Sequence, residues 1–336
     1  MILYYYWFNA EVRVSIASMI YKKTFIRRYD DDHIIHYFSY RDFPGLQAEP
    51  LEFRTKQGNL IKGNIYSYPN PTKANLVIFC HGLGGGHRSY MREIERLCSE
   101  GYEVFSYDNT GCFDSEGADI RGLTESLNVL VSCMDYIASD ESLRGRKLDM
   151  IGHSWGGYAV GNILAFRPAN ICSITVISSF LSLSVYLDKG FGGKTRLIKN
   201  SVMKFERRAN PDYADCNGTD VLKTTNVPVF FIQSKDDCMI DIKAGLEYVK
   251  ANVSNPKVFF LSVDGKGHNP NYTKDAAEYM RNTFSEYHTL IKKKKLKTLE
   301  EKQAYMDSRD FYRMTCQDEE IWSKILNFMA SSRTDC

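Results

Sequence analysis

The chain has 336 residues, 43% of them hydrophobic and 25% charged, a composition typical of a globular protein rather than a disordered one. Its 43 Lys and Arg residues nearly balance 41 Asp and Glu residues, and a formal net charge of +2 gives no basis for a dedicated nucleic-acid-binding protein. The nine cysteines are scattered without a CxxC pair, which argues against a disulfide scaffold or a structural zinc site and favours a reducing, cytoplasmic location.

The N-terminal stretch is apolar and aromatic, but it lacks the basic start and the cleavage site of a secretory signal. Glu11 and Arg13 interrupt it well before the roughly 20 apolar residues that a membrane span needs. Apolar residues recur at helical spacing between Val12 and Ile20, so we expect residues 1–50 to form a helical arm packed on the core. An interfacial membrane anchor is the alternative for this segment.

From residue 51 onward, short apolar runs typical of buried strands alternate with segments of helical spacing. Strands are expected at 51–55, 60–68, 76–80, 102–108, 148–153, 171–180, 227–234 and 258–265. Helices are expected at 90–101, 121–138, 155–166, 241–252, 273–291 and 321–329. This alternation predicts an α/β fold with a mostly parallel sheet, helices on both faces, and ligands at the carboxyl ends of the strands. The pattern stops at 181–222, which predicts a cap inserted between two core strands.

A G-x-S-x-G motif, GHSWG, spans residues 152–156 between an expected strand and an expected helix. This context is the one that a nucleophile elbow requires, because the serine must sit on a sharp turn with its hydroxyl exposed. Gly152 and Gly156 support such an elbow, since larger side chains would clash there. The alternative is an ordinary glycine-rich turn, but the strand–turn–helix context favours Ser154 as a nucleophile.

A glycine-rich loop, HGLGGG, follows the expected strand at 76–80. Backbone N–H groups of such a loop can stabilise a developing oxyanion. We expect one N–H to come from Leu83, supported by Gly82, and a second from Trp155, the residue after the nucleophile. A phosphate-binding role is excluded, because no Lys-Ser or Lys-Thr follows at the required spacing.

An acid and a base follow in the order that this elbow type requires. Asp236 and Asp237 come directly after the strand expected at 227–234, and either could orient a histidine. His268 lies in the loop after the last expected strand, and it is the candidate base. His81 and His153 are interpreted as structural, and without an HExxH pair or a comparable cluster we expect no metal and no cofactor.

In this order the motifs resemble those of the α/β-hydrolase superfamily over residues 50–290. The chain is most similar to the group that contains monoacylglycerol-lipase-like, serine-aminopeptidase-like and cinnamoyl or feruloyl esterase-like enzymes. The DNTGCFDSEG stretch at 108–117 is similar to that group's D-x-x-G-x-G-x-S-x-G loop, although Phe113 and Asp114 replace the second glycine and its neighbour. The family's G-x-x-D-x-x-V/I acid loop aligns its acid with Asp237, which leaves Asp236 as the alternative.

The resemblance implies a core of about eight strands, formed by 51–180 and 223–336, with a helical cap at 181–222 inserted after the sixth strand. It further implies a serine hydrolase that cleaves a carboxylic ester of a small or medium apolar or aromatic acyl group. A peptidase, amidase or acyltransferase on the same triad is the alternative, and a non-catalytic binding protein is a weaker one. The expected partner is a small-molecule ester, and no oligomeric state is indicated. Candidate substrate-pocket residues are His87, Phe180, Tyr186 and Phe191.

Overall fold

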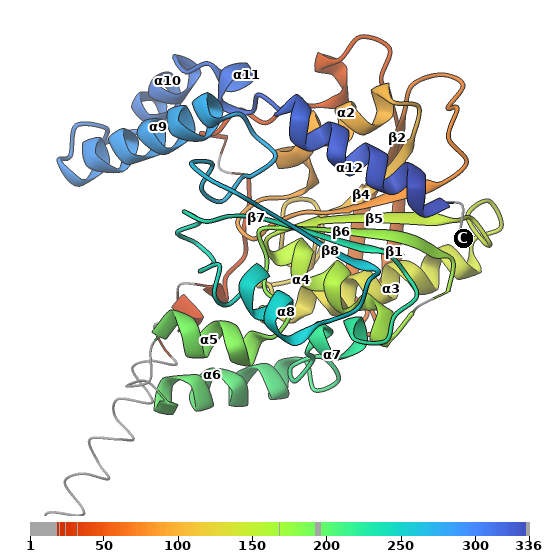
Figure 1. The fold of residues 1–336 in the computed structure, drawn as a ribbon. Helices are drawn as coiled ribbons and strands as arrows, with labels where there is room; N and C mark the ends of the chain where they lie inside the picture. The colour runs from red at the N-terminus through yellow and green to blue at the C-terminus, as the bar shows by residue number, and fades with distance from the viewer. Residues whose placement is uncertain are drawn as a thin grey trace, which may run out of the picture.

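The structure, a computed structural model, describes residues 19–333 except 20, 24, 32, 168 and 192–195. The side chains of 190, 191 and 196–198 also lie outside the described part, as does almost all of the helix expected between Val12 and Ile20. An eight-stranded sheet forms the centre of the molecule, with the strand order β1-β2-β4-β3-β5-β6-β7-β8 (Figure 1).

Every strand expected from the sequence is present, with ends that differ by a few residues. The strands are β1 (Gln47–Arg54), β2 (Leu60–Ser67), β3 (Leu76–Cys80), β4 (Glu103–Tyr107), β5 (Leu148–His153), β6 (Ile171–Ile177), β7 (Val229–Ser234) and β8 (Val258–Val263). Strand β2 pairs antiparallel with β1 and β4, and all other neighbours are parallel. The carboxyl ends of β3 and of β5 to β8 therefore share one edge of the sheet, and the predicted mostly parallel sheet is confirmed.

Helices cover both faces of this sheet (Figure 1). The principal helices are α2 (Met91–Ser99), α3 (Glu125–Ser139), α4 (Trp155–Asn162), α5 (Leu183–Phe191), α6 (Arg196–Ala209), α7 (Gly218–Leu222), α8 (Leu246–Asn252), α9 (Lys274–Lys292), α10 (Leu299–Asp307), α11 (Phe311–Met314) and α12 (Glu319–Ser332). Side chains alternate along β3, so that Val77 and Phe79 join the core under α2 and α12, while Ile78 joins the core over α3 and α4. Burial of each such side chain contributes roughly 1.5–3 kcal/mol.

Helices α5, α6 and α7 connect β6 to β7, where the sequence pattern is interrupted. Helix α6 is joined to the core through Glu206, which is fully buried. Its carboxylate accepts hydrogen bonds from the backbone N–H groups of Leu123 (2.8 Å) and Thr124 (3.1 Å), from the Thr124 hydroxyl (2.8 Å) and from the Tyr21 hydroxyl. Burial raises the pKa of Glu206, an effect that these donors oppose.

The N-terminal arm lies against the loop that follows β4. Tyr29 forms a bridge with Cys112, and Arg28 donates to the carbonyl oxygens of Phe113, Ser115 (2.9 Å) and Gly117 (2.9 Å). Phe113 has a φ of 39°, so it occupies the left-handed conformation for which the family loop uses a glycine.

Two short helices, α10 and α11, were not expected in the charged segment after α9. A capping box at Thr298 and Glu301 starts α10, and this Thr-x-x-Glu signal is visible in the sequence. None of the helices in the described part of the chain combines the length and the hydrophobicity of a membrane-spanning segment.

Seven cysteines in the described part of the chain are free, whereas Cys172 on β6 is disulfide-bonded. Its partner lies outside the described residues.

Candidate active site

Ser154 sits on a sharp turn between β5 and α4, at the edge of the sheet where the parallel strands end. Its backbone has φ 54° and ψ −114°, a conformation that costs a non-glycine residue on the order of 1–3 kcal/mol. The surrounding backbone holds this strain, because the Ser154 N–H donates to Ile177 (2.8 Å) and its carbonyl oxygen accepts from the Ser179 hydroxyl (2.6 Å).

The two motif glycines allow the turn to pack against the sheet. A Cβ at Gly152 would lie 2.3 Å from the carbonyl oxygen of Gly156, and a Cβ at Gly156 would lie 2.0 Å from the carbonyl oxygen of Cys80. Both obstacles are backbone atoms, which cannot move aside as a flexible side chain would. The spacing of the G-x-S-x-G motif therefore follows from close contact among β3, β5 and α4.

Asp237 and His268 meet on loops that follow β7 and β8. The Nδ1 atom of His268 lies 3.0 Å from each carboxylate oxygen of Asp237. The Asp237 side chain is fully buried, and its Oδ1 also accepts the N–H groups of Met239 (2.9 Å) and Ile240 (3.1 Å). These bonds fix the carboxylate in the position from which it can orient an imidazole.

Asp236, the alternative acid, points to the backbone of the histidine loop instead. Its Oδ1 accepts the N–H groups of Gly265 (3.0 Å) and Gly267 (3.1 Å), and it also accepts from the Ser234 hydroxyl. On the other side of the loop, Lys266 forms an ion pair with Asp318 (2.6 Å). The two adjacent aspartates thus have separate positions, one against the imidazole of His268 and one bracing its loop.

His153 and Tyr90 connect the three loops of the site. The Tyr90 hydroxyl accepts the N–H of Gly82 (3.0 Å) and lies 2.8 Å from Nδ1 of His153. The Nε2 of His153 lies 2.8 Å from the carbonyl oxygen of His268, which can only accept. His153 therefore carries its proton on Nε2, and Tyr90 donates to its Nδ1. Burial, together with nearby His268, lowers the pKa of His153 to about 3, so this ring stays neutral.

Two backbone N–H groups are available beside Ser154. Within the described residues, neither the N–H of Leu83 nor that of Trp155 has an acceptor. Trp155 is the first residue of α4, where a helix leaves its N–H groups unpaired. Gly82 is close to the nucleophile, because a Cβ on it would lie 3.3 Å from Cβ of Ser154. The geometry can thus offer two donors to an oxyanion.

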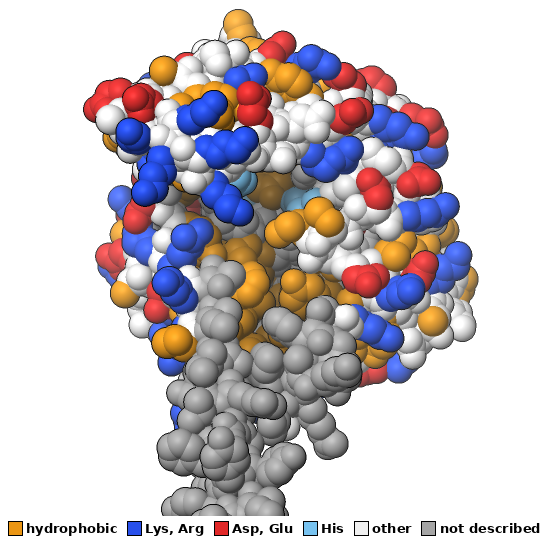
Figure 2. Space-filling model, turned by 90° about the vertical axis from the view of Figure 1, so that its left-hand side faces the viewer, with side chains coloured by type: hydrophobic (Ala, Val, Ile, Leu, Met, Phe, Trp, Pro, Cys, Tyr) orange, Lys and Arg blue, Asp and Glu red, His pale blue; other side chains and the backbone are white. Residues whose placement is uncertain are grey.

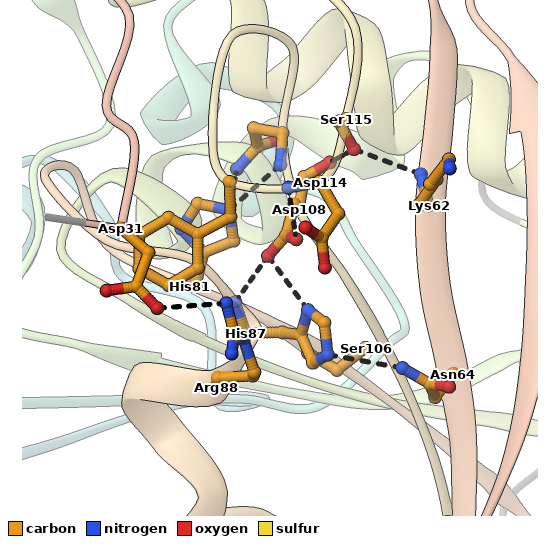
Figure 3. A network of polar contacts seen from close by, with 12 residues as sticks. Asp31, Lys62, Asn64, His81, His87, Arg88, Ser106, Asp108, Asp114 and Ser115 are labelled. Carbon is orange, nitrogen blue, oxygen red and sulfur yellow. Dashed lines mark hydrogen bonds and ion pairs between the residues drawn. The ribbon is translucent and has the colours of Figure 1, made fainter. Parts of the chain in front are cut away.

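A network of buried polar side chains stabilises the glycine-rich loop (Figure 3). Oδ1 of Asp108 accepts from both the backbone N–H and Nδ1 of His87, each at 2.8 Å. Burial alone would raise the pKa of Asp108, but the charge and hydrogen bonds of His87 outweigh this effect and lower the pKa. Nearby, His81 donates from Nδ1 to the Gly82 carbonyl oxygen (2.7 Å), and its Nε2 accepts the Asn109 N–H (2.9 Å).

The expectation that His87 lines the substrate pocket is wrong. His87 is only 3% exposed, its Nε2 lies 2.8 Å from the Tyr66 hydroxyl, and it lines neither cavity near Ser154. The physical reason is the buried carboxylate of Asp108, which draws the imidazole inward, away from the hollow.

A small apolar cavity of about 140 Å³ adjoins Ser154 and His268. Phe180 and Tyr186 line it, as expected, and their rings stack with centroids 4.4 Å apart. The side chain of Phe191 lies outside the described residues. Figure 2 shows the hollowed face, with hydrophobic side chains and histidine inside the hollow and Lys and Arg side chains along part of its rim.

Sequence reasoning missed four residues that line this cavity, namely Phe25, Leu123, Met239 and Ile240. Phe25 belongs to the N-terminal arm, and no local pattern brings it to the site. Ile240 matches the apolar last position of the family's G-x-x-D-x-x-V/I acid loop, and this match was the one sequence signal that could have placed it near the site.

Comparison with known proteins agrees with this geometry. A family model described as the α/β hydrolase fold matches residues 75–193. A putative esterase/lipase of Haemophilus influenzae is 25% identical over 251 residues, which cover 71% of this chain and 80% of that protein. A proline iminopeptidase of Clostridioides difficile is 26% identical over 114 residues, but these cover only 34% of this chain and 38% of the peptidase.

Solved structures show the same fold. An esterase of Pyrococcus furiosus has a TM-score of 0.55 at 18% identity, with 77% of this chain and 96% of that chain covered. Est1E of Butyrivibrio proteoclasticus has a TM-score of 0.52 at 18% identity, with 72% and 98% covered. Together with its sheet and its elbow, these matches show that the chain has the α/β-hydrolase fold.

Proposed function

We propose that the chain is a serine hydrolase that cleaves a carboxylic ester of a small or medium apolar or aromatic acyl group. One observation carries the proposal: His268, bonded to the buried carboxylate of Asp237, lines the same small cavity as Ser154. Ser154 itself sits in a strained turn beside two unpaired N–H groups. This arrangement supports acyl transfer through a Ser-His-Asp triad.

In the proposed mechanism, the Ser154 hydroxyl attacks the ester carbonyl while Nε2 of His268 takes its proton. Asp237 holds the Nδ1 proton and stabilises the imidazolium that forms. The N–H groups of Leu83 and Trp155 bind the tetrahedral oxyanion, and loss of one such donor typically costs about 2.7–4 kcal/mol of barrier. His268 then protonates the leaving alcohol, and water cleaves the acyl-enzyme by the reverse sequence of proton transfers.

The cavity limits the acyl group that fits. A volume of about 140 Å³ is close to that of an engineered cavity of ~150 Å³ that accepts benzene. We therefore expect short-chain or single-ring acyl esters to be hydrolysed fastest. We also propose that residues 181–222 act as a cap, since Tyr186 lines the cavity from this segment and Phe180, directly before it, lines the cavity as well.

A peptidase on the same triad is the second candidate, favoured by the partial match to a proline iminopeptidase. The free amino terminus of a peptide requires an anionic partner. Among the described residues that line the small cavity there is no carboxylate, and this supports the esterase instead.

The test is hydrolysis of p-nitrophenyl esters of graded acyl length by the wild type, Ser154→Ala and Ser132→Ala. Ser132 is also buried, but it lies on α3 and donates to the Asn128 carbonyl oxygen (3.0 Å) away from the site. Esters of aromatic acids belong in the series, because Est1E has been solved with ferulic acid bound. We expect Ser154→Ala to lose several orders of magnitude in kcat and Ser132→Ala to keep its activity.

Two results would contradict the proposal. One is a wild type that turns over no ester and is not labelled by a fluorophosphonate. The other is a Ser154→Ala variant that retains its activity. Turnover of prolyl p-nitroanilide in place of esters would favour the peptidase.

A further inference from the structure

A second cavity lies on the other side of Leu83. Its volume is about 310 Å³, roughly twice that of the cavity at Ser154, and Leu83 lines both. Its walls combine four parts of the chain: the arm at 35–38, the glycine-rich loop at 82–85, the start of α2 and the C-terminal helices α9 and α11. A molecule whose carbonyl group is held at the oxyanion donors therefore has room to extend past Leu83.

The walls from the arm and from α11 belong to segments outside the motifs shared with the family. His36 contacts the rings of Phe38 and Phe311 at centroid distances of 5.3 and 5.5 Å, and these contacts join the two segments. This cavity therefore depends on the arm and on α11 as well as on the glycine-rich loop.

Among the described residues that line this cavity, Arg92 is a cation without a carboxylate partner. Its guanidinium lies over the rings of Tyr312 (5.1 Å to the centroid) and Phe43 (5.9 Å). Its Nε is buried without a hydrogen bond, and within the described residues no carboxylate pairs with it. The hydroxyl of Ser89, which also lines the cavity, is buried and equally without a partner.

Two neighbouring arginines also have a buried Nε without a hydrogen bond, but each of them pairs with a carboxylate. Arg88 pairs with Asp31 (3.2 Å), and Arg96, one turn further along α2, pairs with Glu319 (2.7 Å) and Glu100 (3.5 Å). An aromatic ring attracts the guanidinium charge but accepts no conventional hydrogen bond from it, so the N–H donors of Arg92 stay available for an acceptor. An Arg fork in such a setting matches a carboxylate.

We propose that this second cavity binds the part of the substrate directed away from the small cavity, and that this part is an apolar group ending in a carboxylate held by Arg92 and Ser89. The proposal rests on the esterase function proposed above. At roughly 30 Å³ per water-sized group, the cavity has space for about ten non-hydrogen atoms. A phenylalkanoate has this size and polarity.

The test is direct binding to the Ser154→Ala protein, so that it does not depend on turnover. Isothermal titration calorimetry would compare 3-phenylpropanoate, whose size matches the cavity, with 3-phenylpropanamide, which has nearly the same shape but no charge. We expect the carboxylate to bind at least about tenfold more tightly, as for a hydrogen bond to a charged group. Equal affinities for the acid and the amide would overturn the proposal.

A matched pair of variants tests whether Arg92 causes the preference for the carboxylate. Arg92→Gln and Arg96→Gln each remove one positive charge from the same helix, but only Arg92 lines the cavity. We expect Arg92→Gln to abolish the preference for the carboxylate, Arg92→Lys to keep part of it, and Arg96→Gln to leave it unchanged. Equal losses in the two glutamine variants would show a general charge effect and would also overturn the proposal.

Failure of the esterase proposal would look different. In that case the wild type would hydrolyse no ester, although 3-phenylpropanoate could still bind in the manner described. If Arg92→Gln does not fold, the comparison of acid with amide on the Ser154→Ala protein still decides the matter without it.

Discussion

Tyr90→Phe tests the connection among the three loops of the candidate site. The change removes one hydroxyl and leaves the ring, so no cavity forms. The N–H of Gly82 (3.0 Å) loses its acceptor, and Nδ1 of His153 (2.8 Å) loses its donor. Each buried polar group left without a partner costs about 1–3 kcal/mol, which gives about 2–6 kcal/mol for the pair.

The expected loss of activity follows from the positions of the two groups that Tyr90 contacts. Gly82 precedes Leu83, one of the two proposed oxyanion donors, and Nε2 of His153 lies 2.8 Å from the carbonyl oxygen of His268. We therefore expect kcat/KM to fall at least about tenfold, because a misplacement of about 1 Å can cost 10²-fold. The loss of stability should be nearly constant above pH 4, since a ring with a pKa of about 3 is already neutral there.

Urea denaturation and ester hydrolysis, measured on the same preparations, provide the two readouts. Tyr68→Phe is the matched control, because the Tyr68 hydroxyl makes a single bond to Glu95 (3.2 Å) in a partly exposed position. We expect this control to lose less than about 1 kcal/mol. The reasoning would be refuted if both tyrosine variants lost the same stability and the same activity.

Three further predictions follow from the geometry. Asp237→Asn should lower kcat roughly 10⁴-fold, because the asparagine can no longer hold His268 in the tautomer that accepts the serine proton. Stability should change little, and an ester-hydrolysis assay and urea denaturation measure the two effects. Burial raises the pKa of Glu125 from 4.5 to about 7, so the folded state binds the proton of this carboxyl group more tightly than the unfolded state does. The contribution of this proton to the free energy of unfolding is therefore full below pH 4.5 and is lost as pH rises through 7. Relative to Glu125→Gln, the wild type should thus lose about 3 kcal/mol between pH 4.5 and pH 8 in urea denaturation. Gly156→Ala should be destabilised by several kcal/mol or fail to fold, because its Cβ would lie 2.0 Å from the carbonyl oxygen of Cys80.

Each of these has a contrary outcome. A Gly145→Ala variant, whose Cβ would have nothing within 4 Å, should lose only about 1 kcal/mol despite its φ of 80°, and a similar loss at Gly156 would contradict the packing argument. A difference between wild type and Glu125→Gln that does not change with pH would contradict the titration argument. An Asp237→Asn enzyme as fast as the wild type would remove Asp237 from the triad.

The strands were predictable because their apolar runs are continuous and each ends at a turn signal. The run at 76–80, for example, is buried on both faces of the sheet, and its short length between turn signals favours a strand over a helix. The order of serine, aspartate and histidine was also readable, because each candidate directly follows a predicted strand.

The other features of the site could not be predicted, because they depend on contacts between parts of the chain that are distant in sequence. Adjacent Asp236 and Asp237 are indistinguishable by composition, and only the course of the β7 loop directs one to His268 and the other to the backbone. His87 was a candidate for the substrate pocket, but a carboxylate 21 residues away holds it inside. Phe25 reaches the cavity through the docking of the arm, which no local periodicity reveals.

The bonds at Glu206 have a consequence for how substrate is exchanged. If α6 swung away from the core, the carboxylate would part from the N–H groups of Leu123 and Thr124 and from the Tyr21 hydroxyl, which belong to two other segments. One buried side chain therefore makes the hinge movement of α6 costly. Met239, by contrast, lines the small cavity and is 63% exposed. We therefore expect substrate and product to pass Met239, whose flexible thioether side chain can move aside while α6 stays in place.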